Sequence, residues 1–276
     1  MVKTKALISG GNGFIGTHLR EALRERDIEI HLLPRKFLYS DTSELSTYLS
    51  VIEPDYIYHL AAYVNHYTQR DPGNTLMGNI FTTYNLLEAS KALPYKAFIN
   101  VSSSSVLLPH ETMYSATKAG AERLCRAYAC EYEKPIITVR PYSVYGPGEA
   151  DFRFIPTVFR SCMTGEPMTL APDAVHDWIY VGTFAYVLAG IETIRDIDNK
   201  EINVGTGIAT TNEEVVTMIE KITGKKANIT NRTPMRSFDT YSWVSDAPLY
   251  NATKLYDGLQ SIYEEYKAHN LNESER

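Results

Sequence analysis

The chain has 276 residues, of which 44% are hydrophobic and 22% are charged, and its formal net charge is −6 at pH 7. This length and composition predict a full hydrophobic core, built as one large α/β unit or as two lobes. An acidic balance without a dense Lys/Arg run argues against a nucleic-acid surface. The first residues lead directly into an apolar strand, and no apolar run reaches membrane length, so we expect a cytoplasmic protein.

Three cysteines, Cys125, Cys130 and Cys162, are too few for a disulfide framework. No Cys-x-x-Cys or Cys/His cluster has the spacing of a zinc site. We therefore expect buried structural thiols and no metal.

Apolar runs and helical patterns alternate through the first half of the chain. Residues 5–9 are typical of a buried strand, and a helical stretch follows from Thr17 to Arg26. Strands that alternate with helices predict βαβ units and an α/β fold with a Rossmann-type doubly wound parallel sheet. The further expected strands cover residues 28–33, 55–61, 96–102 and 135–140, and the further expected helices cover residues 45–53, 79–92 and 114–133.

The strict alternation ends after Arg140, where residues 145–149 are turn material. We therefore expect two lobes with a boundary near residue 142. The first lobe contains residues 1–142 and returning segments of 177–205. The second is smaller and mixed α/β, and contains mainly residues 143–276.

Three glycines, Gly10, Gly13 and Gly16, are spaced as Gly-x-x-Gly-x-x-Gly between the first strand and the first helix. A dinucleotide-binding fingerprint requires this context, because glycines permit a tight turn and a close backbone approach. The helix N-terminus then offers N–H groups to a pyrophosphate. We predict that this loop binds the pyrophosphate of a nicotinamide dinucleotide.

The end of the second expected strand indicates which dinucleotide is bound. An NAD enzyme normally places Asp or Glu there to accept from the ribose 2′-hydroxyl. Here Arg35 and Lys36 follow Leu33-Pro34, and no acid is present. An arginine can bind a 2′-phosphate through two hydrogen bonds and stack on adenine. The pair favours NADP(H), with NAD(H) possible; two solvated surface cations are the plain alternative.

Tyr114 and Lys118 stand four residues apart in a long expected helix, so their side chains share one helix face. An ammonium group beside a phenol lowers the pKa of the phenol, because positive charge favours the phenolate. Such a pair suits general acid–base work on a sugar carbonyl or hydroxyl. The spacing is common by chance in a chain with 20 tyrosines, so its meaning depends on the surrounding motifs.

Several motifs follow one another in a definite order. They are Gly10-x-x-Gly13-x-x-Gly16, His59-Leu60-Ala61-Ala62, Val101-Ser102-Ser103, Tyr114-x-x-x-Lys118, Arg140-Pro141, Val144-Tyr145-Gly146-Pro147-Gly148, Asp177-Trp178-Ile179-Tyr180-Val181 and Asn203-Val204-Gly205-Thr206-Gly207. This set resembles the extended short-chain dehydrogenase/reductase family of nucleotide-sugar epimerases, dehydratases and ketoreductases. The resemblance implies an NAD(P)-dependent oxidoreductase that binds the dinucleotide in the first lobe and a nucleotide-diphosphate sugar mainly in the second, as a homodimer.

The resemblance also implies roles for single residues. Tyr114 would be the catalytic acid/base, Lys118 would hold the nicotinamide ribose, and Ser103 would bind the substrate carbonyl or simply cap a strand end. The cofactor would be bound by Gly10, Asn12, Gly13, Phe14, Ile15, Gly16, Arg35, Lys36, Leu60, Ala61, Ala62, Asn79, Val101, Tyr114, Lys118, Pro141 and Val144. The substrate would be bound by Ser104, Ser105, Tyr114, Ser143, Arg153, His176 and Arg236.

The chain departs from the family pattern on the substrate side. The usual Asn before Val-Tyr-Gly is Ser143, which removes an expected amide contact. The usual Arg before Asp-Phe-Ile is His176, which would make a diphosphate contact weaker or pH-sensitive, unless it is a surface histidine. Arg236 could bind the diphosphate or be a solvated loop cation, and Asn79 has a structural role at least as readily as a chemical one.

The residues beside Ser103 separate the possible reactions. By resemblance, 4,6-dehydratases carry Thr-Asp-Glu across these positions and use the carboxylic pair to eliminate water. Ser104 and Ser105 cannot do general acid–base work at neutral pH, so dehydration is disfavoured. The Cys/His pair of C3/C5 epimerisation is also missing, because its positions hold Ser105 and Arg153.

Two reactions remain. One is NADPH-dependent reduction of a 4-keto(-6-deoxy) nucleotide sugar to the 4-hydroxy sugar, with a proton from Tyr114. The other is C4 epimerisation with tightly held NAD. Arg35 and Lys36 favour the reductase. A third hypothesis is a non-catalytic NAD(P)-binding sensor or scaffold, and the intact Ser103, Tyr114 and Lys118 argue against it.

Overall fold

A computed structural model describes residues 3–63, 71–109, 112–191, 200–235 and 243–274, with side chains up to residue 268. The chain divides into two compact units. Unit 1 contains Met1–Pro141 and Ala185–Asn203, and unit 2 contains Tyr142–Phe184 and Val204–Arg276. Unit 1 is therefore discontinuous in sequence.

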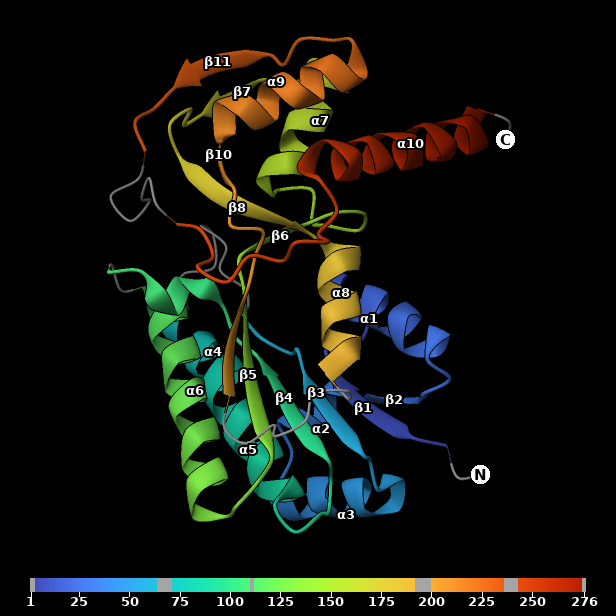
Figure 1. The fold of residues 1–276 in the computed structure, drawn as a ribbon, viewed down its shortest axis with the longest axis vertical. Helices are drawn as coiled ribbons and strands as arrows, with labels where there is room; N and C mark the ends of the chain where they lie inside the picture. The colour runs from blue at the N-terminus through green and yellow to red at the C-terminus, as the bar shows by residue number, and fades with distance from the viewer. Residues whose placement is uncertain (1–2, 64–70, 110–111, 192–199, 236–242, 275–276) are drawn as a thin grey trace. The chain divides into compact units, whose positions relative to one another are not determined.

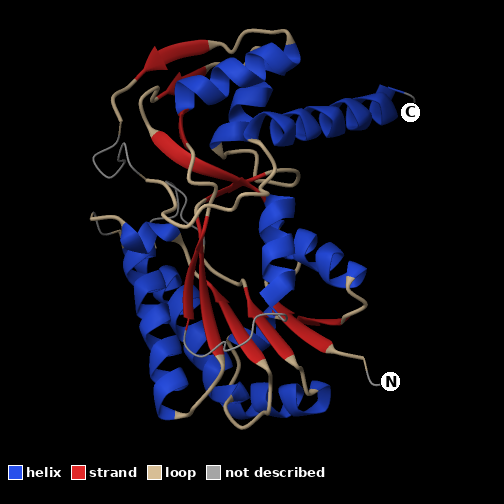
Figure 2. Cartoon of the chain, in the orientation of Figure 1, coloured by secondary structure: helices blue, strands red, loops and turns tan. Residues whose placement is uncertain are grey.

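A parallel sheet forms the centre of unit 1 and confirms the predicted fold class. Its strand order is β2-β1-β3-β4-β5-β9, and helices flank it (Figures 1 and 2). The pairs β1–β2, β1–β3, β3–β4 and β4–β5 are all parallel. The strands are β1 (Lys5–Ser9), β2 (Glu29–Leu33), β3 (Tyr56–His59), β4 (Ala97–Val101), β5 (Ile136–Pro141) and β9 (Lys200–Val204).

The helices of the first half differ from the expected ones at several ends. The first helix begins at Phe14 rather than Thr17, directly after the glycine loop. A short helix that the sequence did not suggest begins at Arg35. The helix expected from Asn79 begins at Pro72 and contains a π-helical turn. These helices are α1 (Phe14–Glu25), α2 (Arg35–Leu38), α3 (Thr42–Ile52), α4 (Pro72–Leu76), the π-turn η1 (Met77–Phe81), α5 (Thr82–Ser90), the 3-10 helix η2 (Ser104–Leu107) and α6 (Met113–Glu131). Later in the chain, α8 (Val181–Gly190) begins in unit 2 and ends in unit 1.

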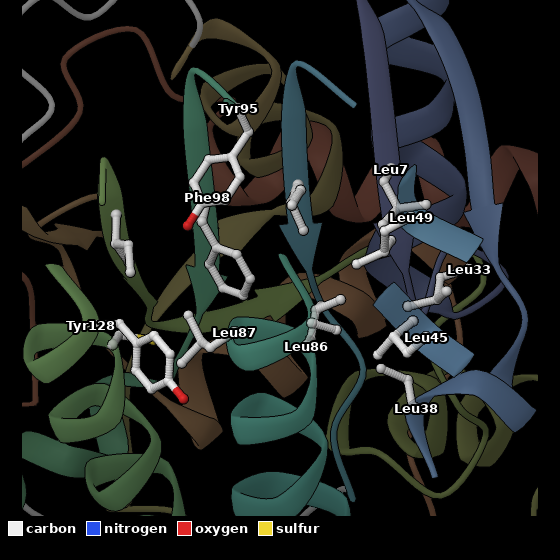
Figure 3. Packing of buried hydrophobic residues seen from close by; sticks show 14 of the residues in the cluster. Leu7, Leu33, Leu38, Leu45, Leu49, Leu86, Leu87, Tyr95, Phe98 and Tyr128 are labelled. Atoms are coloured by element: carbon white, nitrogen blue, oxygen red, sulfur yellow. The ribbon is translucent and has the colours of Figure 1, made fainter. Parts of the chain in front are cut away.

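Figure 3 shows the hydrophobic core on one face of this sheet. Leu7 of β1 and Phe98 of β4 are fully buried against Leu45 of α3, Leu86 of α5 and Tyr128 of α6. Each such side chain contributes roughly 1.5–3 kcal/mol when it leaves water. This apolar core gives way to polar residues toward the carboxyl ends of the same strands, where Ser9, His59 and Asn100 are buried.

A buried ion-pair network ties α6 to the neighbouring strands. Arg140 of β5 donates from Nε to Glu122 Oε1 of α6 over 2.9 Å, and its second nitrogen contacts both Glu122 and Glu201 of β9. The side chain of Glu122 is 3% exposed and that of Arg140 is 11% exposed. Hydrogen bonding to Glu122 raises the pKa of Arg140. The network stands one helical turn from Lys118.

Unit 2 is mixed α/β. A three-stranded sheet has the order β10-β8-β6, and a second sheet pairs β11 with β7. Phe159, Trp178, Ile219 and Leu259 belong to its buried core. The elements are β6 (Ser143–Tyr145), α7 (Phe154–Thr164), β7 (Met168–Leu170), β8 (Val175–Tyr180), β10 (Ala209–Thr211), α9 (Asn212–Thr223), β11 (Ile229–Arg232) and α10 (Leu255–Ser274).

The cysteines are all free thiols, but they are not all buried. Cys125 and Cys162 are buried, whereas Cys130 is exposed, so the expectation of buried thiols is wrong for Cys130. Cys130 lies near the C-terminal end of α6. None of the helices in the described ranges is long and apolar enough to cross a membrane.

Candidate active site

The glycine loop has the geometry that a pyrophosphate-binding turn requires. Gly13 N donates to Gly10 O over 3.0 Å, and Gly10 has a left-handed φ of +72°. A Cβ on Gly16 would lie 2.3 Å from Gly10 O. Gly13 is the N-cap of α1, without a side-chain cap and without an acidic residue in the first turn. The first turn therefore keeps backbone N–H groups and a positive dipole end for a phosphate.

Gly16→Ala is expected to weaken nicotinamide dinucleotide binding by about tenfold or more, because a backbone clash must open the turn. Fluorescence titration of the dinucleotide measures this. Gly190→Ala is the matched control, since a Cβ there meets nothing within 4 Å. Equal affinity of Gly16→Ala and wild type would contradict the role of the turn.

Asn12, Phe14 and Ile15 complete the loop. The side chain of Asn12 accepts from Arg20 Nη1 over 3.1 Å, and Asn12 is exposed. Phe14 and Ile15 are half-buried at the start of α1. Ala61 lies just after β3, the strand that pairs with β1. Gly10 packs so closely against it that a Cβ on Gly10 would lie 2.8 Å from Ala61 N. Leu60, Ala61 and Ala62 are half-buried, and all three lie after the end of β3.

His59, the last residue of β3, is buried and has a polar partner at each ring nitrogen, and sequence reasoning had not placed it at the site. Its Nδ1 lies 2.7 Å from Ser9 Oγ, and its Nε2 lies 3.0 Å from Thr83 Oγ1. Burial and, second, the Lys118 charge lower the pKa of His59 to about 3. The only sign in the sequence was a histidine within an apolar strand, and ordinary core histidines show the same pattern.

The free energy of unfolding is expected to fall as pH drops below 6.5. The unfolded chain protonates His59 near pH 6.5, whereas the folded chain does so only near pH 3. The unfolded state therefore binds more protons between these values, and stability declines by about 1.4 kcal/mol for each pH unit. Urea unfolding of wild type and His59→Gln at pH 6 and pH 5 measures how steeply the free energy of unfolding changes with pH in each protein. Identical slopes would contradict the burial of a neutral histidine.

Tyr114 and Lys118 lie in the first turns of α6. Thr112 caps this helix in a capping box with Ser115, so the helix starts at a defined residue. Lys118 is 4% exposed and its Nζ donates to Val101 O over 2.7 Å. Burial lowers the pKa of Lys118 to about 8, while Cys125 and Glu122 oppose this effect. Tyr114, one turn earlier, is only partly buried.

Ser103 follows β4 and caps the 3-10 helix η2. Its Oγ accepts from Ser105 N over 3.2 Å and from Ser105 Oγ over 2.9 Å. The strand-end cap anticipated as an alternative is therefore present, and both lone pairs of the Ser103 oxygen accept hydrogen bonds in it. Ser105 remains partly buried, whereas Ser104 is 1% exposed.

Asn79 lies in the π-turn η1 and is 1% exposed. Its Oδ1 accepts from Tyr63 N over 2.7 Å, and its Nδ2 donates to Thr117 Oγ1 over 3.0 Å. The amide thus ties the segment after β3 to α6, beside Lys118. These contacts are structural, which is the role that we expected at least as readily as a chemical one.

Arg35 and Lys36 are the first two residues of the short helix α2, which begins two residues after β2 ends at Leu33. Pro34 is the N-cap of this helix and has φ −61°, which starts it directly after β2. Both side chains are exposed. Arg35 Cζ lies 5.8 Å from the centroid of the Tyr39 ring, and Lys36 Nζ lies 4.9 Å from that of Phe37.

His176 of unit 2, one of the residues expected to bind the substrate, lies near two tryptophan rings. The His176 ring centroid lies 5.0 Å from that of Trp178 and 5.6 Å from that of Trp243. His176 Nδ1 lies 3.2 Å from Ser143 Oγ, because β6 and β8 are neighbouring strands. The residues at the two positions where the chain departs from the family pattern therefore contact each other.

The remaining residues that were expected to bind the cofactor or the substrate are found in several elements. Arg153 is the N-cap of α7, and Val144 lies in β6. Pro141 is the last residue of β5 in unit 1. Arg236 lies outside the described residues.

Several known proteins are similar to this chain. A family model described as "NAD dependent epimerase/dehydratase family" matches residues 6–205. The chain is 31% identical over 256 residues to the trifunctional UDP-glucose 4,6-dehydratase/UDP-4-keto-6-deoxy-D-glucose 3,5-epimerase/UDP-4-keto-L-rhamnose-reductase RHM3 of Arabidopsis thaliana, which covers 76% of this chain and 38% of that protein. The chain thus spans well under half of that relative's length.

Two further similarities concern a reductase and a solved structure. The chain is 30% identical over 167 residues to the GDP-6-deoxy-D-mannose reductase of Pseudomonas aeruginosa, covering 53% of this chain and 54% of that protein. The structure of MoeE5 in complex with UDP-glucose and NAD is similar with a TM-score of 0.86 and 26% identity, covering 96% of this chain and 99% of that one.

Proposed function

The chain belongs to the NAD-dependent epimerase/dehydratase family, and from that premise we propose that it is an NADPH-dependent reductase of a 4-keto nucleotide sugar. The product would be the 4-hydroxy sugar. The family comprises NAD-dependent enzymes that act on nucleotide sugars, and relatives include a protein named as a reductase of a keto sugar nucleotide.

One observation carries this proposal. In addition to Tyr114 and Lys118, the two positions that follow Ser103 decide the reaction. They hold Ser104, which is buried, and Ser105, whose hydroxyl is bonded into the cap of η2. Hydroxyl groups of serine cannot take up and release protons at neutral pH as a carboxylic pair does. Tyr114 is therefore the proton donor that this part of unit 1 offers, and one proton with one hydride reduces one ketone.

The residues of unit 1 can perform the protein's part of that reaction. Ser103 keeps its hydroxyl hydrogen for the substrate carbonyl, since its oxygen acts as the acceptor in both hydrogen bonds from Ser105. Tyr114 then transfers its phenolic proton to the oxygen of the carbonyl as that oxygen gains negative charge. The buried Lys118 favours the phenolate that remains, because a positive charge stabilises it. The dinucleotide supplies the hydride to the carbonyl carbon when it is bound.

The loop geometry fits a dinucleotide. Gly10 and Gly16 leave no room for a Cβ, and the first turn of α1 presents uncapped N–H groups. Arg35 and Lys36 lie exposed after β2, where an acidic residue would repel a 2′-phosphate. These observations support NADP(H) over NAD(H).

Arg35→Ala is expected to weaken NADPH binding by about tenfold and NADH binding much less, because NADH has the adenine on which Arg35 can stack but lacks the 2′-phosphate. Arg24→Ala, an exposed arginine in the last turn of α1, is the matched control. Parallel titrations with NADPH and NADH measure both affinities. Tighter binding of NADH by the wild type would refute the NADP preference.

An NAD-dependent C4-epimerase is the second candidate. It needs the same Ser103, Tyr114 and Lys118, because it oxidises and re-reduces one carbon. The similarity to MoeE5, solved with UDP-glucose and NAD, favours it. A non-catalytic NAD(P)-binding protein would need none of the three.

Extraction of bound dinucleotide separates the candidates. The purified protein is denatured and the extract is chromatographed. A reductase should release far less than one dinucleotide per chain and should oxidise NADPH when a 4-keto-6-deoxy sugar nucleotide is added. Stoichiometric NAD in the extract, without NADPH oxidation, would replace the reductase by the epimerase. Dinucleotide binding without reductase or epimerase activity would point to the non-catalytic NAD(P)-binding protein.

The remaining assignments are part of the same proposal. Unit 1 would bind the dinucleotide, and Ser143, Arg153, His176 and Arg236 would contact the nucleotide-diphosphate sugar. A homodimer is expected from the family resemblance, and analytical ultracentrifugation measures it.

A further inference from the structure

A row of polar residues crosses the carboxyl end of the unit 1 sheet. Ser9, His59, Asn100 and Thr138 are successive register partners on β1, β3, β4 and β5. Each is at most 4% exposed. Buried polar groups are costly unless they are hydrogen-bonded, so the bonds that this row makes are informative.

The hydrogen bonds around His59 have one consistent direction. Thr83 Oγ1 donates its hydrogen to Asn79 O over 2.7 Å, so toward His59 it can only accept, and Nε2 must carry the hydrogen. Ala61 N donates to Ser9 Oγ over 3.3 Å. Ser9 then donates its own hydrogen to Nδ1 over 2.7 Å. His59 is therefore the neutral Nε2–H tautomer.

A protonated His59 would break this arrangement. With hydrogen on both ring nitrogens, Nδ1 could no longer accept from Ser9. The buried Lys118 ammonium also disfavours a second positive charge nearby. His59 is thus a fixed connector and not a proton carrier. In an ordinary core, a buried histidine can bond to any nearby polar group. Here the two partners of His59 connect it to the glycine loop through Ser9 and to α6 through Thr83.

One end of the chain of bonds reaches the glycine loop. Ser9 is the last residue of β1, directly before Gly10, and it receives the N–H of Ala61. Gly10 packs against that same Ala61 nitrogen. The Ser9–Ala61 bond therefore sets the distance between the two segments that border the loop.

The other end reaches α6. Thr83 bonds to the carbonyl of Asn79, and the Asn79 side chain donates to Thr117 Oγ1 over 3.0 Å. Thr117 directly precedes Lys118. The strand before the glycine loop is thus connected to the helix of Tyr114 by hydrogen bonds and, within Asn79, by the covalent link between its backbone carbonyl and its side chain.

We propose that His59 is a positioning residue, which as a neutral Nε2–H imidazole holds the glycine loop in register with α6 and so prepares the loop for the dinucleotide. This inference rests on the dinucleotide-binding part of the proposed function. It assigns a role to a side chain that does not touch the reacting atoms.

Two measurements test the inference. In the first, ¹⁵N-labelled wild type is observed by NMR without ligand, and the nitrogen shifts of His59 report its tautomer. We expect a single neutral Nε2–H form that does not titrate between pH 8 and pH 5. An Nδ1–H form, or titration in that range, would overturn the inference. The result is independent of whether the protein binds a dinucleotide.

In the second, Thr83→Val removes the acceptor of Nε2–H with little change in shape. We expect dinucleotide affinity to fall about tenfold, with kcat at saturation changed less than about twofold. Thr83→Ser keeps the hydroxyl and should restore the affinity. Thr82→Val is the matched control, because Thr82 is as buried as Thr83 and its hydroxyl donates to Gly78 O, the carbonyl one turn earlier in its own helix.

The outcomes separate this inference from the function. Equal affinities of Thr83→Val, Thr82→Val and wild type would overturn the positioning role. Wild type that binds no dinucleotide would refute the proposed function, while the NMR result would still decide the tautomer. If Thr83→Val fails to fold, Thr83→Ser with wild-type affinity and an Nε2–H signal supports the inference, and Thr83→Ser with an Nδ1–H signal overturns it.

Discussion

Tyr114→Phe is expected to lower kcat for NADPH oxidation by about 10³-fold, while the dinucleotide still binds with wild-type affinity. A positioned general acid contributes on the order of 10²–10⁴ in rate. Phenylalanine keeps the ring and removes the hydroxyl that gives the proton. The neighbouring hydroxyls cannot replace it, since Ser103 caps η2 and Ser105 donates to Ser103.

Steady-state kinetics with a 4-keto-6-deoxy sugar nucleotide measure this loss. Tyr132→Phe provides the control, because Tyr132 caps the other end of α6 and makes an exposed ring contact with Lys91. It should keep full activity. Turnover of Tyr114→Phe within a few-fold of wild type would remove Tyr114 from the mechanism, and equal losses in both variants would point to helix damage.

Arg140→Leu is expected to lower the free energy of unfolding by about 3–5 kcal/mol and the Tm by roughly 10 °C. The substitution leaves Glu122 buried without its charged partner, which is far costlier than losing an exposed pair. Glu122 also lies one turn from Lys118 and raises its pKa against burial.

Urea denaturation and calorimetry measure the stability change. Arg232→Leu is the matched control, because its pair with Glu213 is exposed and worth at most about 1 kcal/mol. The double variant Glu122→Leu/Arg140→Leu should recover part of the loss, since neither charge remains buried. A cost for Arg140→Leu as small as that of Arg232→Leu would show that Glu122 is hydrated and not buried.

Much of this architecture could be predicted because it depends on local chemistry. Gly10, Gly13 and Gly16 occur between a strand and a helix, and that order alone predicts a parallel sheet with a phosphate-binding turn. The strands follow from short apolar runs, and their ends were right within a few residues. The capping of α6 by Thr112 lies just ahead of the Tyr114 pair, so both residues fall on the predicted helix.

Other features depend on contacts between distant segments and could not be read locally. His59 meets Thr83 only because β3 ends level with the start of α5. The sequence presented a cap and a contact to the substrate carbonyl as alternatives for Ser103, whereas the cap uses its oxygen only as an acceptor and is compatible with the expected contact. The π-turn around Asn79 places the amide against Tyr63 and Thr117, whereas residue spacing alone suggests an unbroken α-helix. Pro34 follows the expected end of β2, but the short helix that begins at Arg35 was not expected.

The discontinuity of unit 1 has a consequence for synthesis on the ribosome. Its sheet is completed by β9, which pairs beside β5, although residues 142–184 of the other unit intervene in the chain. Until residue 204 has emerged, β5 remains an edge strand with unpaired backbone groups, and Arg140 lacks Glu201. A nascent chain halted before that point carries the glycine loop and Tyr114 on an unfinished sheet. Cotranslational folding of this unit must therefore end late, after most of the chain has been made.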